Sequence, residues 1–333
     1  SHSEDLAKLL EGPGVPFYCG FDPTSDSLHV GSMLPLILMR RLQVRGHTPI
    51  VLLGSATGMI GDPSGKSEER VLLDEARIQA NTEGIEKQIQ LFLSSEGKNA
   101  YQIVRNDQWL RELNYIEFLR DVGKHFTVNS MIAKDSVKSR LESREQGISY
   151  TEFSYMLLQA YDFHWLNKEK GCRLQVGGSD QWGNITAGLE LIRRMGSDDE
   201  HSAYGLTFPL LTTASGTKFG KTEKGAVWLS SEKTSAYQFY QYWLNTADAD
   251  VIRYLKLFTD IDNERLIELS AAAEKDPASR QAQKFLAETL CTLVHGKEQS
   301  EHAISASTVL FGGSMAEVTS ETLLDIFKDV PST

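Results

Sequence analysis

The most constraining feature of this sequence is an alternation of short apolar segments with longer amphipathic ones between Val15 and about Leu211. The short segments have the length of strands, and apolar residues in the longer ones recur with the period of a helix. Such alternation is typical of a doubly wound parallel sheet with helices on both faces. The expected strands are Pro16–Phe21, Pro49–Gly54, Tyr101–Arg105, Arg173–Val176 and Thr207–Leu211. The expected helices between them are Val30–Arg45, Asp74–Leu93, Gln108–Val122, Thr151–Leu166 and Asp180–Met195.

Beyond about residue 225 the strand signals give way to helical periodicity alone. The expected helices of this part are Ala236–Leu244, Asp248–Phe258, Asn263–Ala273, Ser279–Val294 and Glu298–Leu310. We therefore predict an α/β fold, with a Rossmann-like doubly wound parallel sheet over residues 1–225 and a smaller all-α domain over residues 226–333. A helical insertion around residues 107–174 is placed where an open sheet would carry a dimerising or partner-binding element.

Composition excludes several classes of protein. The chain has 333 residues, 41% of them hydrophobic, and no apolar stretch approaches the roughly 20 residues of a membrane span. Cys19, Cys172 and Cys291 show no CxxC spacing, and the eight histidines form neither an HExxH motif nor a close His/Cys pair. We expect no disulfide framework and no metal site built by the protein. The expected location is the cytoplasm, or the mitochondrial matrix if a transit peptide has been removed.

The formal net charge of −11 at pH 7 argues against general binding to nucleic acid, because phosphate contacts need Lys and Arg. Local basic groups occur nonetheless, for example Arg40 and Arg41 with Arg45, or Arg193 with Arg194. A solvated helix face explains each of them equally well. Net charge therefore leaves an RNA partner open.

Two segments far apart in the sequence carry the strongest functional signal. Residues 23–32 (PTSDSLHVGS) connect an apolar strand to an apolar helix, whose N-terminus offers N–H groups and partial positive charge to a phosphate. Residues 218–222 (KFGKT) place two ammonium groups beside a glycine and a hydroxyl, which suits a loop over pyrophosphate. Together they predict an ATP site.

A glycine-rich segment, residues 58–66 (GMIGDPSGK), follows the second expected strand at the sheet edge where ligands bind in open α/β folds. Asp62 could hold an ammonium group, and Lys66 with Arg70 could contact phosphate. The spacing is not that of a P-loop. A loop that only turns the chain is the alternative for this segment taken alone.

Polar residues also mark one face of an otherwise apolar helix. Tyr155, Gln159 and Asp162 are spaced i, i+4 and i+7, which predicts a pocket lining, with an exposed polar stripe as the alternative. Tyr18, in the first strand, could grip a phenolic hydroxyl together with Asp162, although a lone tyrosine in a strand is more often part of the core. Residues 175–184 (QVGGSDQWGN) form a further strand, glycine turn and helix start that suits a ribose.

Taken together, these motifs closely resemble those of bacterial-type tyrosyl-tRNA synthetases, which are class I aminoacyl-tRNA synthetases. The resemblance extends from about Val15 to Val330 and includes a HIGH-type segment at residues 29–32 and a KMSKS-type segment at residues 218–222. It implies attack of the tyrosine carboxylate on the α-phosphate of ATP, giving tyrosyl-adenylate and pyrophosphate, and then transfer to the 3′ end of tRNA(Tyr). Because a carboxylate is already a nucleophile, such a protein only positions the reactants and stabilises charge.

The resemblance also implies roles for individual residues. Those expected to be catalytic are His29, Ser32, Lys66, Arg70, Lys218, Lys221 and Thr222. Those expected to bind L-tyrosine are Tyr18, Asp62, Tyr155, Gln159, Asp162 and Gln175, with Tyr18 and Asp162 on the phenol and Asp62, Tyr155 and Gln159 on the ammonium group. Those expected to bind ATP, which brings Mg²⁺ with it, are Cys19, Gly20, Asp22, Thr24, His29, Gly31, Gly178, Asp180, Gln181 and Lys221.

Two departures from the family pattern stand out. Ser32 replaces the second histidine of the HIGH motif, so this position offers a short neutral hydroxyl, and we expect weaker stabilisation without loss of the reaction. Bacterial members usually carry a further C-terminal RNA-binding domain, and the resemblance leads us to expect that these 333 residues do not include it. The resemblance makes residues 226–333 the helical anticodon-binding domain and residues 118–126 part of a homodimer interface.

Two alternatives are compatible with the same motifs. Tryptophanyl-tRNA synthetases share the fold and the adenylating segments, but a Tyr/Asp pair suits a phenol better than an indole, whose N–H cannot accept a hydrogen bond. An RNA-binding paralogue without catalysis is favoured only by Ser32. Lys218, Lys221, Asp62 and Asp162 oppose it.

Overall fold

The computed structural model describes residues 2–64, 73–134, 137–138, 141, 147–196, 202–214, 216, 219–222 and 225–310. Packing divides the chain into two compact units. The sheet unit comprises Ser1–Asp26 and Leu38–Leu210, and the helical unit comprises Ser27–Ile37 and Leu211–Thr333. The helical unit therefore includes the HIGH-type segment near the start of the chain, although the sequence places it next to the first strand. The proposed domain boundary after residue 225 stays a prediction.

The sheet unit is built on five parallel strands in the order β3-β2-β1-β4-β5. They are β1 (Pro16–Phe21), β2 (Thr48–Leu53), β3 (Gln102–Arg105), β4 (Leu174–Gly178) and β5 (Tyr204–Phe208). Chain order reverses between β1 and β4, so their carboxyl ends form the crevice in which ligands of open α/β sheets bind. The predicted α/β fold with a doubly wound parallel sheet is confirmed.

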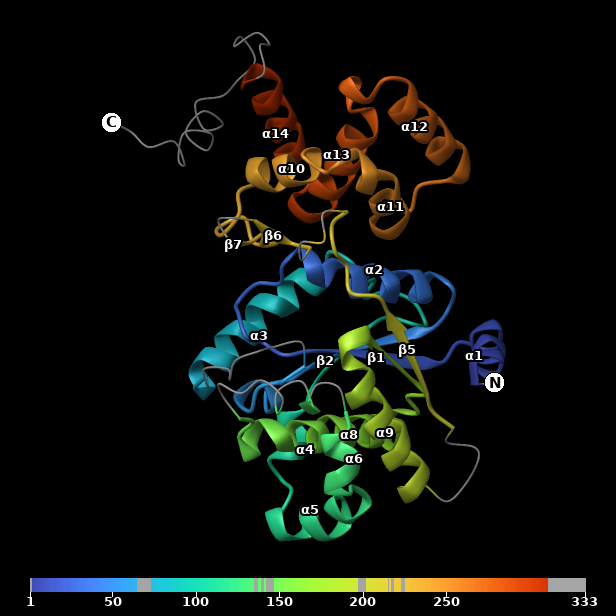
Figure 1. Cartoon of the computed structure of the whole chain (residues 1–333), viewed down its shortest axis with the longest axis vertical. Coiled ribbons are helices and arrows are strands. Elements are labelled where there is room, and N and C mark those ends of the chain that lie inside the picture. The colour runs from blue at the N-terminus through green and yellow to red at the C-terminus, as the bar shows by residue number, and fades with distance from the viewer. Residues whose placement is uncertain are drawn as a thin grey trace. The chain divides into compact units, whose positions relative to one another are not determined.

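Helices of the sheet unit lie on both faces of the sheet, with α3 on one side and α8 and α9 on the other (Figure 1). The long helices are α1 (His2–Glu11), α2 (Val30–Val44), whose first half belongs to the helical unit, α3 (Glu75–Ile89), α8 (Tyr150–Lys170) and α9 (Trp182–Met195). Ser149 caps α8 by accepting the Glu152 N–H, and Gly171 ends it in the left-handed region at φ 61°. The length of α8 lets one helix present several polar groups to the crevice.

Short elements complete the sheet unit, and two expectations about boundaries were wrong. These elements are η1 (Thr57–Met59), α4 (Asp107–Leu110), α5 (Tyr115–Asp121), η2 (Gly123–His125), α6 (Val128–Ile132) and η3 (Ser179–Gln181). The single helix expected over Gln108–Val122 is interrupted, because Asn114 caps a new helix by accepting the Ile116 and Glu117 N–H groups. Strand β5 begins at Tyr204, earlier than expected, because this edge strand is only half buried and lacks a strong apolar signal.

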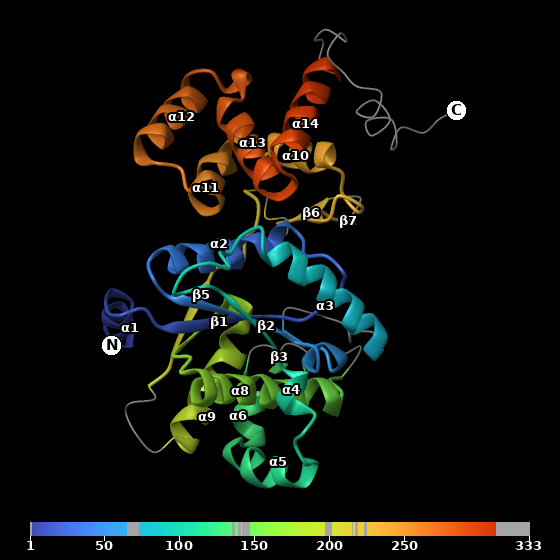
Figure 2. The ribbon, with the colours of Figure 1, turned by 180° about the vertical axis from the view of Figure 1, so that it is seen from behind.

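The helical unit packs α10 (Ala236–Leu244), α11 (Asp248–Phe258), α12 (Asn263–Lys275) and α14 (Lys297–Leu310) against α13 (Gln281–His295) (Figure 2). Leu286 and Leu290 of α13 are fully buried. A capping box between Ser235 and Gln238 starts α10. A short hairpin of β6 (Lys221–Thr222) and β7 (Gly225–Ala226) precedes α10. None of the helices that the structure describes is long and apolar enough to cross a membrane.

Candidate active site

A polar pocket lies in the sheet unit at the point where chain order reverses. Tyr18 of β1 and Gln175 of β4 are register partners, so their side chains share one face of the sheet. Both are almost fully buried, at 1% and 3% exposure. Tyr18 Oη and Gln175 Oε1 nevertheless find no hydrogen-bond partner among the residues that the structure describes. Since an unsatisfied buried polar atom is costly, the two atoms mark a place for a ligand with polar groups of its own.

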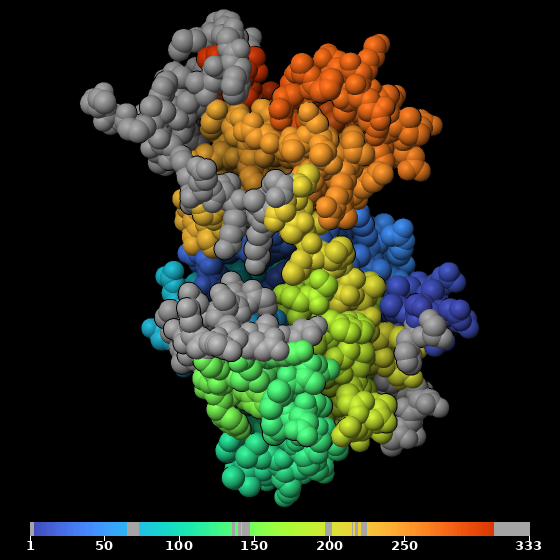
Figure 3. All heavy atoms as spheres, viewed as in Figure 1, coloured from blue at the N-terminus to red at the C-terminus, as the bar shows by residue number. Residues whose placement is uncertain are grey.

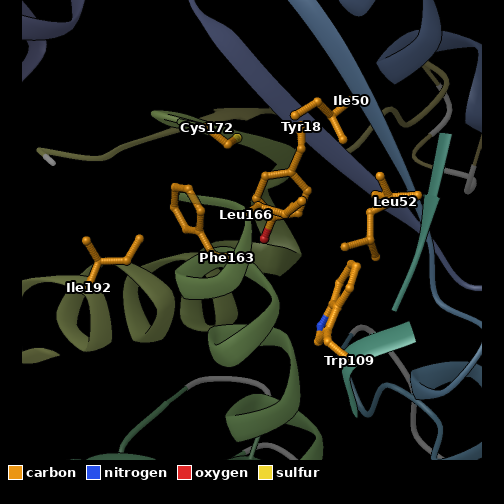
Figure 4. Close-up of a cluster of buried hydrophobic side chains, with 9 residues drawn as sticks. Tyr18, Ile50, Leu52, Trp109, Phe163, Leu166, Cys172 and Ile192 are labelled. Atoms are coloured by element: carbon orange, nitrogen blue, oxygen red, sulfur yellow. The ribbon is translucent and has the colours of Figure 1, made fainter. Parts of the chain in front are cut away.

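The ring of Tyr18 is fixed by apolar neighbours. Its centroid lies 5.2 Å from that of Phe163 on α8. Figure 4 shows the hydroxyl pointing from β1 toward α8, with Leu166 beside the ring and Trp109 across the pocket. The Trp109 ring is stacked on Trp165 at 4.1 Å between centroids. These contacts fix the position of the hydroxyl and shield it from water.

Asp162 of α8 faces the same pocket and is 1% exposed. Its Oδ1 accepts a hydrogen bond from Trp109 Nε1 at 2.8 Å, and its Oδ2 accepts one from Asn106 Nδ2 at 3.0 Å. Burial raises the pKa of Asp162 to about 8, although these two bonds oppose the shift. Burial and then the Asp162 charge raise the pKa of Tyr18, so the two groups interact. Together they offer a donor and an acceptor to a hydroxyl.

A second carboxylate, Asp22 at the end of β1, is connected to Asp162 through side chains. Tyr155 Oη donates to Asp22 Oδ2 at 2.8 Å, and Thr57 Oγ1 donates to Asp22 Oδ1 at 2.9 Å. Asn106 Nδ2 donates to Thr57 Oγ1 at 2.9 Å as well as to Asp162. A continuous hydrogen-bond network therefore supports this side of the pocket and limits its movement.

A third carboxylate, Asp62, follows η1 and is 7% exposed. Its Oδ2 accepts a hydrogen bond from Gln181 Nε2 at 2.7 Å, and its Oδ1 accepts one from the Ser64 N–H at 2.9 Å. Asn184 Nδ2 donates to Gln159 Oε1 at 3.0 Å beside it. Asp62 forms no ion pair with a Lys or Arg in the described part of the chain. Because buried carboxylates are stable only when compensated, this end of the pocket favours a cationic ligand group.

The structure thus brings together the six residues expected to bind tyrosine in one unit: Tyr18, Asp62, Tyr155, Gln159, Asp162 and Gln175. Four supporting residues were missed by sequence reasoning, namely Thr57, Asn106, Trp109 and Asn184. Asn106 comes directly after β3, at the carboxyl edge of the sheet, which is the one signal that could have identified it. Asp22 was expected to bind ATP; its carboxylate accepts a hydrogen bond from Tyr155, a residue expected to bind tyrosine.

Residues expected on the nucleotide lie around the same edge of the sheet. Gly20 is exposed within an otherwise buried strand, on the face of β1 shared by Tyr18 and Asp22, so it leaves that face open. Gly178 ends β4, where a Cβ would come within 2.4 Å of Asp180 Oδ1. Cys19 is buried on the opposite face, and the Thr24 N–H donates to the Asp22 carbonyl at 2.8 Å.

The HIGH-type and KMSKS-type segments meet within the helical unit. His29 Nδ1 accepts the Gly31 N–H at 3.0 Å, so in the neutral ring the proton is on Nε2. A Cβ on Gly31 would lie 2.7 Å from His29 Cε1, which explains the glycine. Gly220, at φ 78°, packs against Val30, where an added Cβ would lie 3.0 Å from Cγ2. The Val30 N–H donates to the Val227 carbonyl at 2.9 Å, and the Val227 N–H donates to the Gly220 carbonyl at 3.2 Å, so backbone contacts through Val227 connect the two segments.

The remaining catalytic candidates are described to different extents. Ser32 is half buried in the first turn of α2, and its N–H donates to the His29 carbonyl at 2.7 Å. Lys221 and Thr222 form β6, and only their backbone is described. Lys66, Arg70 and Lys218 lie outside the described residues. Within the described ranges, no group of three or more His, Cys, Asp or Glu could hold a metal ion.

Comparison with known proteins identifies the family. Residues 13–312 match the model of the tRNA synthetases class I (W and Y). The chain belongs to this family. Tyrosine--tRNA ligase 1 of Bacillus cereus is 54% identical over 331 residues, which are 99% of this chain and 78% of that protein. The tyrosine--tRNA ligase of Staphylococcus carnosus is 53% identical over 99% of this chain and 77% of its own.

Solved structures of the family agree with this assignment. A C-terminally truncated mitochondrial tyrosyl-tRNA synthetase of Aspergillus nidulans has a TM-score of 0.81 and 32% identity, covering 92% of this chain and 89% of that one. That of Coccidioides posadasii has a TM-score of 0.77 and 36% identity, covering 91% and 86%. A tryptophanyl-tRNA synthetase of Giardia lamblia has a TM-score of 0.62, but its 16% identity shows the fold alone; it covers 97% of this chain and 84% of that one.

Proposed function

We propose that this family member is a tyrosine-tRNA ligase. In the first step a carboxylate oxygen of L-tyrosine attacks the α-phosphorus of ATP, and the bond to pyrophosphate breaks. In the second step the 3′-terminal ribose hydroxyl of tRNA(Tyr) attacks the activated carbonyl, and AMP leaves. The observation that carries the proposal is the buried Tyr18 hydroxyl beside Asp162, which has no hydrogen-bond partner among the described residues, in a chain 54% identical to a tyrosine--tRNA ligase.

Tyrosine is proposed to bind with its phenol against Tyr18 and Asp162. The phenol both donates and accepts a hydrogen bond, so it satisfies the Tyr18 hydroxyl and adds to the bonds on the Asp162 carboxyl. The α-ammonium group is assigned to Asp62, Tyr155 and Gln159, and Gln175 contributes its unpartnered carbonyl to the pocket. The absence of a Lys or Arg partner on Asp62 within the described ranges supports the ammonium assignment.

ATP is proposed to bind as its Mg²⁺ complex. His29 would donate from Nε2 to a phosphate oxygen, because its Nδ1 is held by the Gly31 N–H. The other residues assigned to ATP binding are Cys19, Gly20, Asp22, Thr24, Gly31, Gly178, Asp180, Gln181 and Lys221. Ser32 is assigned, with His29, to the ATP phosphates and ribose. The residues proposed to stabilise the charge on the departing pyrophosphate are Lys66, Arg70, Lys218, Lys221 and Thr222.

Selection of tyrosine over phenylalanine follows from the same pocket. Bound phenylalanine would exclude water from the Tyr18 hydroxyl without offering it a hydrogen bond. Tyrosyl-tRNA synthetases are the standard example of this way of rejecting a substrate. Tryptophan fits less well, because its indole N–H can donate but not accept. An RNA-binding paralogue without catalysis is favoured by no feature of the pocket, whose network around Asp162 serves a small ligand.

Homodimerisation is proposed through an apolar surface of the helical insertion. Tyr115, Ile116, Leu119, Val128 and Ile132 of α5 and α6 are 37–69% exposed. Figure 3 shows α5 and α6 in green at the surface of the sheet unit. Such a concentration of exposed large apolar residues is typical of a protein interface. The cytoplasm, or alternatively the mitochondrial matrix, is the proposed location.

The experiment that tests the function is ATP–pyrophosphate exchange with tyrosine, phenylalanine and tryptophan in parallel, with Mg²⁺ and without tRNA. Exchange that depends on tyrosine alone is expected. Exchange that depends on tryptophan would instead indicate a tryptophanyl-tRNA synthetase. No exchange with any of the three would favour the RNA-binding paralogue.

A further inference from the structure

We infer that Tyr242 and Asp250 of the helical unit are positioning residues for the KMSKS-type segment. This inference rests on the proposed function, because that segment is assigned to charge stabilisation during tyrosine activation. Neither residue was singled out by any motif in the sequence. All the contacts involved lie within the helical unit.

The aromatic side chain of Phe219 anchors the segment in the helical unit. Phe219 is 7% exposed and stacks on Phe258 of α11 with 5.3 Å between ring centroids. The Tyr254 ring meets it edge-on at 5.2 Å, and the Trp243 ring lies at 5.8 Å. Apolar packing alone would allow this ring to slide or turn, so a directional contact is needed to fix the backbone that follows it.

Tyr242 of α10 supplies that directional contact. Its Oη accepts the Gly220 N–H at 3.1 Å, and its ring meets Phe219 edge-on at 6.2 Å. Gly220 is buried and has φ 78°, so the chain turns sharply here before it enters β6 at Lys221. The same glycine packs against Val30 at the start of α2. The tyrosine hydroxyl therefore holds the turn that sets Lys221 relative to the HIGH-type helix.

Asp250 of α11 holds the chain on the other side of the segment. Its Oδ2 accepts the Ala214 N–H at 2.8 Å, and the residue is 3% exposed. The Phe219 N–H also donates to the Leu211 carbonyl, which precedes Ala214 in the chain, at 3.2 Å. Side chains from two helices thus fix both flanks of the segment, and the helices of this unit control the geometry of residues that act on ATP.

Tyr254 provides a matched control for Tyr242. It belongs to the same aromatic cluster and is 3% exposed, yet its hydroxyl has no hydrogen-bond partner among the described residues. Replacing either tyrosine by phenylalanine removes one hydroxyl group and keeps the ring. Only Tyr242→Phe removes a bond to the segment, so any difference between the two variants reports that bond.

The test measures tyrosine activation in the whole chain by single-turnover formation of tyrosyl-adenylate. Tyr242→Phe is expected to lower the maximal rate about five- to tenfold, the effect of one lost hydrogen bond on a positioned group, with tyrosine affinity unchanged. Tyr254→Phe is expected to match the parent chain. Limited trypsin digestion gives a second readout, with faster cleavage after Lys221 expected in Tyr242→Phe alone.

Asp250 provides a second test in case Tyr242→Phe folds poorly. Asp250→Asn retains an oxygen that can accept the Ala214 N–H, whereas Asp250→Ala does not, so only the alanine variant should lose rate. Equal rates and equal cleavage for Tyr242→Phe and Tyr254→Phe, or equal rates for the two Asp250 variants and the parent, would overturn the inference. If the parent chain itself forms no tyrosyl-adenylate, the proposed function fails instead.

Discussion

Replacing Tyr18 by phenylalanine should make the free protein more stable while damaging its choice of substrate. The Tyr18 hydroxyl is buried and has no partner among the described residues, so folding removes it from water without compensation. Such a loss costs about 1–3 kcal/mol, and phenylalanine avoids it while keeping the ring against Phe163. We therefore expect the free energy of unfolding to rise by about 1 kcal/mol, the lower end of that range.

Tyr155→Phe is the matched control, because it removes the same atom from another buried tyrosine of the same unit. The Tyr155 hydroxyl donates to the Asp22 carboxylate at 2.8 Å, and a hydrogen bond to a charged group contributes about 1.5–3 kcal/mol. This variant should therefore be destabilised. Urea titrations of the two variants and the parent chain, without ligand, measure the difference.

Bound tyrosine should stabilise the parent chain and Tyr18→Phe to different extents. Saturating tyrosine supplies the missing partner to the Tyr18 hydroxyl, so the parent chain should gain more stability from tyrosine than Tyr18→Phe does. In pyrophosphate exchange, the preference of Tyr18→Phe for tyrosine over phenylalanine should fall. The reasoning is refuted if Tyr18→Phe loses as much stability as Tyr155→Phe, or if its substrate preference is unchanged.

Four further predictions concern Asp162, Lys221 and the apolar surface. Burial raises the folded-state pKa of Asp162 to about 8, against about 3.9 in the unfolded chain. Its contribution to stability is therefore full at low pH and is lost as the pH rises through that window. The free energy of unfolding should fall between pH 5 and pH 8 by more in the parent chain than in Asp162→Asn, and urea titrations that show the same fall in both would contradict this. Asp162→Ala should abolish tyrosine activation, and near-normal exchange kinetics would remove the residue from the pocket. Lys221→Ala should lower the rate of adenylate formation far more than tyrosine affinity, as single-turnover and equilibrium binding measurements would show, whereas equal losses would argue against a transition-state role. Ile116→Asp, at a residue 69% exposed, should shift the protein toward monomer in sedimentation, and an unchanged mass would place the interface elsewhere.

Local sequence determined the elements of this fold and the chemistry at its motifs. The apolar residues of β1 and β2 and the helical period of α10 and α11 predict these elements nearly to the residue, because strand and helix periodicities depend on neighbours along the chain. The i, i+4, i+7 spacing on α8 likewise put Tyr155, Gln159 and Asp162 on one face before any packing was known.

Tertiary structure decided which groups have partners. Trp109 and Asn106 reach Asp162 across more than 50 positions of sequence, and nothing local marks either as a carboxylate ligand. The same holds for Tyr242, which no motif connects to Gly220. Hydrogen bonds require atoms within about 3 Å, and that proximity arises only when separate elements pack, so the sequence supplies polar side chains but not their pairing. The Tyr18 hydroxyl follows the same logic: the sequence places a tyrosine in a buried strand, and only packing determines that its oxygen has no hydrogen-bond partner among the residues that the structure describes.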